Sequence, residues 1–176
     1  TPLQRITPMT LAETASIFCQ TIVQEAVLGE VGPAEQFHIL EASSQDACQV
    51  VVDISSRFLF ERSVFSKRKE RELSASEFKA LMLEAQTQPY GNGLDRNALH
   101  PYMWAVKPHY YMTSYYNYPY MFGLLFGLGL YAQYREDPEE FKAGYDELLA
   151  STGMFDAAEL AERFGMDIHS PAFWQG

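Results

Sequence analysis

A chain of 176 residues, 47% of them hydrophobic and 14% aromatic, has the length of one domain and enough apolar side chains to bury a core. This composition excludes a disordered chain, and the net charge of −10 argues against binding to nucleic acid or to an anionic membrane surface. We therefore expect one folded domain over residues 1–176.

The cysteine content and the lengths of the apolar runs indicate the cellular compartment of such a protein and whether it enters a membrane. Cys19 and Cys48 both lie in apolar helical patterns, so we predict reduced thiols in the core of a cytoplasmic protein rather than a disulfide framework. The most apolar run, residues 121–132, is shorter than the roughly 20 residues that a membrane span needs. We predict a buried helix there and no membrane association.

The chain opens with a predicted helix that starts at Thr7-Pro8, an N-cap followed by proline, and reaches about Gly29. Its apolar stripe recurs at helical spacing through Leu11, Ala15, Phe18, Ile22 and Ala26. Glu13 lies on another face, together with Ser16, Gln20 and Gln24. That face is either solvated or directs Glu13 into a polar site, and the pattern alone leaves both readings open.

Two more helices follow in the first half of the chain. Pro33 opens a second helix that we expect to pass Arg62, with an apolar stripe at Phe37, Leu40, Ala47, Val51, Ile54, Phe58 and Phe65. A capping box of Ser74 and Glu77 starts a third helix, which we expect to stop at Pro89. A loop rich in Gly and Asn then leads to residue 100.

The second half is also predicted to be helical. Three glycines, Gly123, Gly127 and Gly129, lie inside the helix that follows Pro119, which suggests that its backbone packs closely against a neighbour. Asp137-Pro138 and Asp156 begin two further helices. No segment shows the alternation of a β-strand, so the fold class is predicted to be all-α and multi-helical.

The stretch from His100 to Gly123 is rich in Tyr and Trp and contains two histidines. Each tyrosine or tryptophan joins an apolar body to a polar tip, so it can be buried and still present a hydrogen-bond donor. His109 among these tyrosines is either a satisfied core histidine or a donor to the negative oxygen of a tetrahedral intermediate. Composition does not choose between the two.

Several common active-site motifs are not found in the sequence. There is no GxxxxGK[ST], no GxGxxG after a strand, no CxxC and no GxSxG. Neither HExxH nor a pair of histidines at helical spacing occurs, so the chain by itself cannot build a histidine-based zinc site.

Four blocks together resemble the C-terminal part of the oligoendopeptidase F family of zinc metallopeptidases, which cleave short peptides and belong to the thimet-oligopeptidase-like clan. The blocks are MTLAETASIF, YGNGL…LHPYMWAVKPHYY, YYNYPYMFGLLFGLGLYA and FGMDIHSPAFW. In that family zinc is held by the two histidines of HExxH and by a glutamate on a following helix. The resemblance therefore implies that Glu13 is the third zinc ligand.

The resemblance also assigns roles to the aromatic stretch. The family's His and Tyr that bind the substrate carbonyl and its oxyanion match His109 and Tyr118 best. Tyr116 and Tyr120 are alternatives or neighbours that bind substrate, because small gaps shift the register of the tyrosines.

The helix with HExxH, which carries two zinc ligands and the general base, is expected just upstream and is absent from this chain. We therefore expect a C-terminal helical fragment of a catalytic domain whose partners are the upstream HExxH part and an oligopeptide. A metal site needs its full set of ligands, so this chain alone should neither hold catalytic zinc tightly nor hydrolyse peptides. A fragment of this kind should expose an apolar face through which it can self-associate.

Two other functions remain open from the sequence. The chain could be a non-catalytic helical module whose aromatic stretch packs a core or binds a partner helix. It could also present its tyrosines as a peptide-binding surface without catalysis. The first of these predicts no metal-dependent activity even when the upstream sequence is present.

Overall fold

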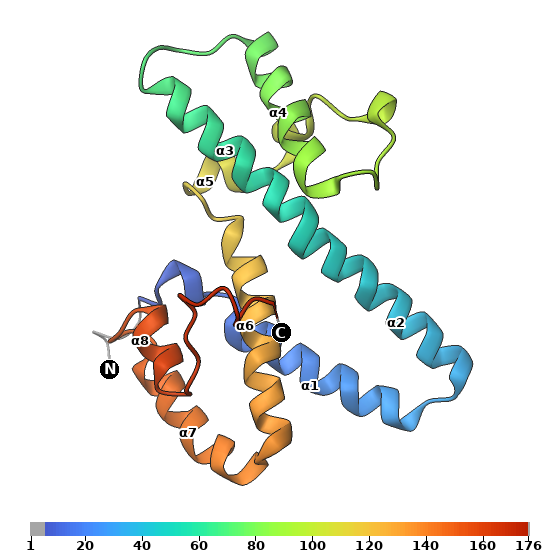
Figure 1. Cartoon of the computed structure of the whole chain (residues 1–176), viewed down its shortest axis with the longest axis vertical. Helices are drawn as coiled ribbons and strands as arrows, with labels where there is room; N and C mark the ends of the chain where they lie inside the picture. The colour runs from blue at the N-terminus through green and yellow to red at the C-terminus, as the bar shows by residue number, and fades with distance from the viewer. Residues whose placement is uncertain (1–5, 176) are drawn as a thin grey trace. The chain divides into compact units, whose positions relative to one another are not determined.

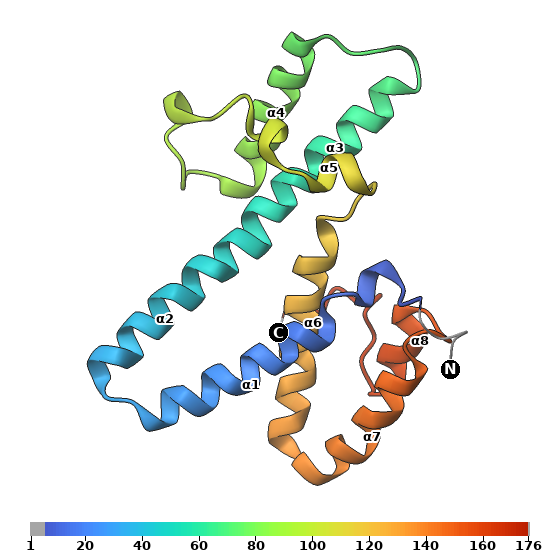
Figure 2. The ribbon, with the colours of Figure 1, turned by 180° about the vertical axis from the view of Figure 1, so that it is seen from behind.

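The computed structural model of the protein describes residues 6–175. Helices make up 72% of the described residues, and none of these residues forms a strand, so the prediction of an all-α fold is confirmed. Figures 1 and 2 show the helices from opposite sides. Within this described range, no helix is both long and apolar enough to cross a bilayer.

The contacts of the chain gather into two compact units, which are described separately. One unit contains the described residues 6–32 and 122–175, and the other contains residues 33–121. Helix α6 (Tyr118–Glu136) begins in the second unit and continues in the first. The single domain expected from the sequence stays a prediction.

The first unit is built from α1 (Thr14–Glu30), most of α6, α7 (Pro138–Ser151) and α8 (Ala157–Glu162). Helix α1 packs against α7 through aromatic side chains: the ring of Phe18 lies against that of Phe141, with centroids 5.4 Å apart. The core formed by these helices contains the buried side chains Leu11, Phe18, Phe126, Leu130, Phe141, Leu148, Leu160 and Met166. The unit is thus held by aromatic and leucine packing.

The glycines of α6 explain how closely the helices approach. A Cβ placed on Gly123 would lie 3.1 Å from the backbone carbon of Glu13, and one on Gly127 would lie 3.4 Å from the nitrogen of Phe18. The predicted close backbone packing is therefore confirmed at Gly123, whereas a Cβ at Gly127 would make an ordinary contact with the backbone of Phe18. Gly129 instead faces side chains, the ring of Phe173 and the sulfur of Met166.

The first helix begins later than predicted. Pro8 has extended geometry and is followed by one 3-10 turn, Met9–Leu11, before α1 starts at Thr14. The expected apolar stripe is buried at Leu11 and Phe18, but its last member, Ala26, is exposed. Only the first half of α1 packs on the core of its unit.

The second unit begins with α2 (Pro33–Cys48) and α3 (Ile54–Arg68), joined by a π-helical turn, Gln49–Asp53. The predicted long helix is therefore confirmed, but the π turn within it was not foreseen. Helix α4 (Ala75–Tyr90) packs along α3, as Figure 1 shows. Their shared core contains Phe60, Val64, Leu81, Met82 and Ala85.

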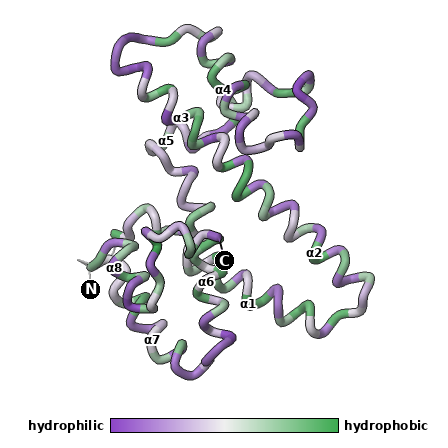
Figure 3. Tube along the Cα trace, in the orientation of Figure 1, coloured by the Kyte–Doolittle hydropathy of each residue, from purple (hydrophilic) through white to green (hydrophobic). Residues whose placement is uncertain are grey.

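The capping box at the start of α4 is confirmed. The amide of Ser74 donates to Glu77 Oε2 at 2.9 Å, and the amide of Glu77 donates to Ser74 Oγ at 3.4 Å. The connection from α3 to α4 is hydrophilic in Figure 3. The helix passes Pro89 by one residue and ends before Gly91, which has φ of +53°.

The predicted burial of the cysteines is wrong, and the apolar stripe of the second helix is only partly buried. Cys19 and Cys48 are exposed free cysteines, not core thiols. Phe37 and Leu40, in the first half of the second stripe, are 65% and 51% exposed. The apolar periodicity continues along α2, but the core that it would cover lies only beneath α3.

The later helix boundaries follow the predicted caps. Asp137 Oδ1 accepts the amides of Glu139 and Glu140 at the start of α7. Asp156 begins α8 with a capping box, and Gly165 follows with φ of +69°. Between α4 and α6 the chain is irregular, with short turns at Arg96–Ala98 and Met103–Val106 and a four-residue helix α5 (His109–Met112).

Candidate functional site

Glu13 occupies the residue just before α1 and is half-buried. Its carbonyl is engaged in starting the helix, because it accepts the amide of Ile17 at 3.1 Å and the hydroxyl of Ser16 at 2.9 Å. Since Gly123 lies against its backbone, the position of Glu13 is set by helix packing within the first unit. These contacts fix the backbone of Glu13, whose side chain is of a type that zinc accepts as a ligand.

Three predicted site residues of the second unit come together. The His109 ring stacks on Tyr116, with centroids 5.9 Å apart and an interplanar angle of 5°. Tyr120 meets both rings edge-on, at 5.7 Å from His109 and 6.0 Å from Tyr116. We call His109, Tyr116 and Tyr120 the aromatic triad.

The triad places two polar groups side by side. The hydroxyl of Tyr120 lies 3.4 Å from Nε2 of His109, and the imidazole tautomer decides which of them donates. The other ring nitrogen, Nδ1, is buried and has no hydrogen-bond partner among the described residues. An unpaired buried nitrogen is uncommon in native proteins and calls for an explanation, one of which is a catalytic role.

Tyr118 is the first residue of α6 and is half-buried. Residues two positions apart on a helix do not face the same side, so Tyr118 and Tyr120 point in different directions. The sequence resemblance predicts the donor role for Tyr118, whereas the described ring contacts of His109 are with Tyr116 and Tyr120. The role of Tyr118 stays a prediction.

Next to the triad lies a buried polar cluster that the sequence analysis missed. Asp53, Arg57 and Glu61 occur at successive four-residue spacings, and each is no more than 6% exposed. Arg57 forms an ion pair with Asp53 and donates from Nη1 to Oδ1 of the fully buried Asn117, at 3.4 Å. The signal that could have revealed them is their spacing, because charged residues four positions apart lie on the same side of a helix.

Burial shifts the protonation equilibria of this cluster. Desolvation raises the pKa of Glu61, although its hydrogen bonds oppose the shift. Desolvation also raises the pKa of Tyr110, whose hydroxyl donates to the Arg57 carbonyl at 3.4 Å. Burial and the nearby Asp53 carboxylate raise the pKa of Tyr90 to about 12.

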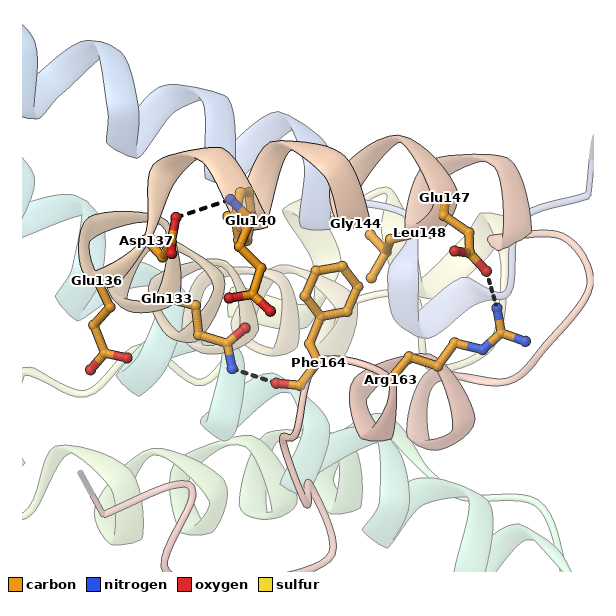
Figure 4. A pocket seen from close by; sticks show the side chains of 10 residues that line it. Gln133, Glu136, Asp137, Glu140, Gly144, Glu147, Leu148, Arg163 and Phe164 are labelled. Carbon is orange, nitrogen blue, oxygen red and sulfur yellow. Dashed lines mark hydrogen bonds and ion pairs between the residues drawn. The ribbon is translucent and has the colours of Figure 1, made fainter.

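A cavity in the first unit is lined by none of the predicted site residues. It measures about 570 Å³ and is shown in Figure 4. Several of its polar groups are paired with each other: Arg163 pairs with Glu147, and Gln133 donates a hydrogen bond to the Phe164 carbonyl. The full lining is Gln133, Glu136, Asp137, Glu140, Phe141, Gly144, Glu147, Leu148, Arg163 and Phe164.

The donor atoms needed for a catalytic zinc site are not assembled in residues 6–175. No group of three or more His, Cys, Asp and Glu side chains in this range could hold a metal ion. Catalytic zinc has three protein ligands, so Glu13 alone does not fit a zinc ion. Any such site would need ligands beyond those described.

Comparison with known proteins gave no match: no family model, no curated protein and no solved structure is significantly similar to this chain.

Proposed function

We propose that this chain is part of a zinc metallopeptidase that hydrolyses oligopeptides. In this proposal Glu13 is one of the three protein ligands of the metal. His109 and a neighbouring tyrosine bind the substrate carbonyl. The proposal rests on the resemblance of the four sequence blocks, and the observation that carries it is the aromatic triad with its unpaired His109 Nδ1.

The triad supplies the chemistry that the proposal needs from this chain. An imidazole N–H and a phenol O–H are donors that can stabilise negative charge on a carbonyl oxygen during attack. Packing of His109 on Tyr116 restricts the orientation of the imidazole. Donors that are oriented before the reaction need no reorganisation, and losing one typically costs about 3–4 kcal/mol of barrier.

Kinetics of the complete gene product test these roles, provided that it contains the expected HExxH. We expect His109→Ala to lower kcat by roughly 100- to 1,000-fold on a fluorogenic oligopeptide, with bound zinc retained. The same loss is expected from replacing whichever tyrosine, Tyr118 or Tyr120, donates to the substrate carbonyl. Tyr118→Phe and Tyr120→Phe distinguish the donor favoured by the motif from the one favoured by contact. Tyr111→Phe, an exposed tyrosine of the same stretch, is the control.

Wild-type rates in His109→Ala, Tyr118→Phe and Tyr120→Phe would show that the site mapping is wrong. The isolated chain is predicted to have no peptidase activity even with added zinc. Turnover by the isolated chain that is abolished by Glu13→Ala would overturn that prediction.

A second candidate function is a non-catalytic interaction module. It is favoured by exposed apolar side chains beside the triad, since Val106, Tyr111 and Met112 are 74%, 64% and 79% exposed. This function predicts no metal-dependent hydrolysis by the complete gene product. The same fluorogenic assay therefore separates the two candidates.

A further inference from the structure

Tyr115 has the one left-handed backbone among the described non-glycine residues, with φ of 61°. A side chain with a Cβ is disfavoured in this conformation, so surrounding contacts must hold it. The residue lies in the irregular segment between α5 and α6, directly before Tyr116 of the aromatic triad.

Helix α3 provides those contacts from one face. The amide of Tyr115 donates to Glu61 Oε1 at 2.7 Å. The Tyr115 ring lies 5.8 Å from that of Phe58 and 5.2 Å from that of Phe65. Positions 58, 61 and 65 follow helical spacing, so a single side of α3 holds both the backbone and the ring of Tyr115.

The chain then continues into the triad. Tyr116 stacks on His109, and its amide donates to the Thr113 carbonyl at 3.4 Å. The ring of Tyr115 therefore packs on α3, whereas the ring of the next residue, Tyr116, packs on His109. The left-handed turn at Tyr115 permits this division.

Burial of the Glu61 carboxyl is otherwise difficult to explain. It is only 4% exposed, and burying a carboxylate is costly unless it is well paired. Asn117 lies near enough to lower its pKa, yet neither Glu61 Oε2 nor Asn117 Nδ2 makes a hydrogen bond of good geometry in the described part of the chain. The bond to the Tyr115 amide is therefore the principal one that this carboxyl makes.

We infer that Glu61 is a positioning residue: its buried carboxylate holds the left-handed turn at Tyr115 and thereby aligns Tyr116 with His109. The catalytic meaning of this alignment rests on the proposed function, but the alignment itself does not. Glu61→Gln keeps an acceptor for the Tyr115 amide, and Glu61→Ala removes it. Val64→Ala, which truncates a buried α3 residue of the shared core, is the matched control for general loosening.

Nuclear magnetic resonance of this chain tests the alignment without any catalytic assay. In the wild type the Tyr115 amide should be protected from hydrogen exchange, and ring protons of His109 and Tyr116 should show a nuclear Overhauser effect. Glu61→Gln should keep both signals. Glu61→Ala should speed Tyr115 exchange by about tenfold or more and weaken the His109–Tyr116 contact, and Val64→Ala should leave both in place.

The inference is wrong if Glu61→Ala leaves both signals unchanged, or if Val64→Ala disturbs them equally. If Glu61→Ala does not fold, the wild type and Glu61→Gln still test the inference. An unprotected Tyr115 amide in the wild type, or loss of the His109–Tyr116 ring contact in Glu61→Gln, would overturn it. In an active complete gene product, Glu61→Ala should lower kcat by about 100-fold while Glu61→Gln restores the rate. An inactive gene product would refute the proposed function and leave the resonance result standing.

Discussion

Gly123 of α6 lies against the backbone of Glu13, so closely that a Cβ at position 123 would be 3.1 Å from both the carbonyl carbon and the Cβ of Glu13. It would also lie 3.2 Å from the Cδ1 of Ile17. The glycine therefore helps to fix the residue that the family resemblance assigns to zinc. This relationship lies within the first unit and joins residues 110 positions apart in the sequence.

Gly123→Ala should destabilise the protein by about 1–2 kcal/mol, because overpacking against the Glu13 backbone outweighs the helix propensity of alanine. Chemical denaturation measures this change. Gly127→Ala is the matched control in the same helix, since its Cβ would meet Phe18 at an ordinary contact distance of 3.4 Å. Equal stabilities of the two variants would contradict the tight contact at position 123.

The buried pair of Asp53 and Arg57 gives a second prediction. Arg57→Ala leaves Asp53 buried without its partner and removes the donor to Asn117, so it should cost about 3–5 kcal/mol of unfolding free energy. The double variant Asp53→Leu with Arg57→Met should be less destabilised than Arg57→Ala, because no charge is then left unpaired. Urea unfolding of the single and double variants measures this difference. A double variant less stable than Arg57→Ala would show that the ion pair itself contributes most of the energy.

The raised pKa of Glu61 predicts a pH dependence of stability. A carboxyl whose folded pKa lies above its unfolded value of 4.5 contributes stability that is complete below pH 4.5 and is lost as pH rises through the folded pKa. Glu61→Gln removes this titration. The stability of the wild type relative to Glu61→Gln should therefore fall as the pH is raised above 4.5, as thermal unfolding at a series of pH values across this range would show. A constant difference across this range would contradict the raised pKa.

The capping box of α4 predicts a local loss of stability. Ser74→Ala removes the acceptor of the Glu77 amide and should cost about 1 kcal/mol. Arg71 and the Ser74 groups lower the pKa of Glu77 to about 2. The stability that Glu77 contributes should thus be present above pH 4.5 and disappear as pH falls toward 2, in a titration followed by unfolding. No cost in Ser74→Ala at neutral pH would contradict the cap.

The sequence predicts the helices well because their signals are local. The caps at Ser74, Asp137 and Asp156 act through hydrogen bonds to amides within three residues, so they can be recognised without knowing the tertiary fold. The sequence also predicts the close packing at Gly123, because glycine destabilises a helix interior and its presence there suggests that a neighbouring backbone approaches closely. What Gly123 contacts could not be foreseen.

Burial was harder to predict, since it depends on which elements meet. Phe37 and Cys19 follow apolar helical patterns, yet both are exposed because no part of the described structure covers them. Conversely, Arg57 and Glu61 look like residues of a solvated face but are buried. Only tertiary packing places Asn117 and Tyr115, more than fifty residues away, beside them.

In the candidate site, too, the residues could be named from the sequence but their contacts could not. The resemblance named His109, with Tyr116 and Tyr120 as alternatives or neighbours of Tyr118, and the structure brings the rings of His109, Tyr116 and Tyr120 together. The resemblance ranks Tyr118 above Tyr120, whereas the ring that meets His109 edge-on at 5.7 Å is that of Tyr120.

The most direct test of the central claim compares zinc content and peptide hydrolysis in the complete gene product and its Glu13→Gln variant. The proposal predicts zinc-dependent hydrolysis by the wild type. It predicts that Glu13→Gln weakens zinc binding by more than about 100-fold and loses activity in parallel. Wild-type zinc content and wild-type hydrolysis in Glu13→Gln would contradict the assignment of Glu13 as a metal ligand, and a wild type that hydrolyses no peptide with zinc bound would contradict the enzyme itself.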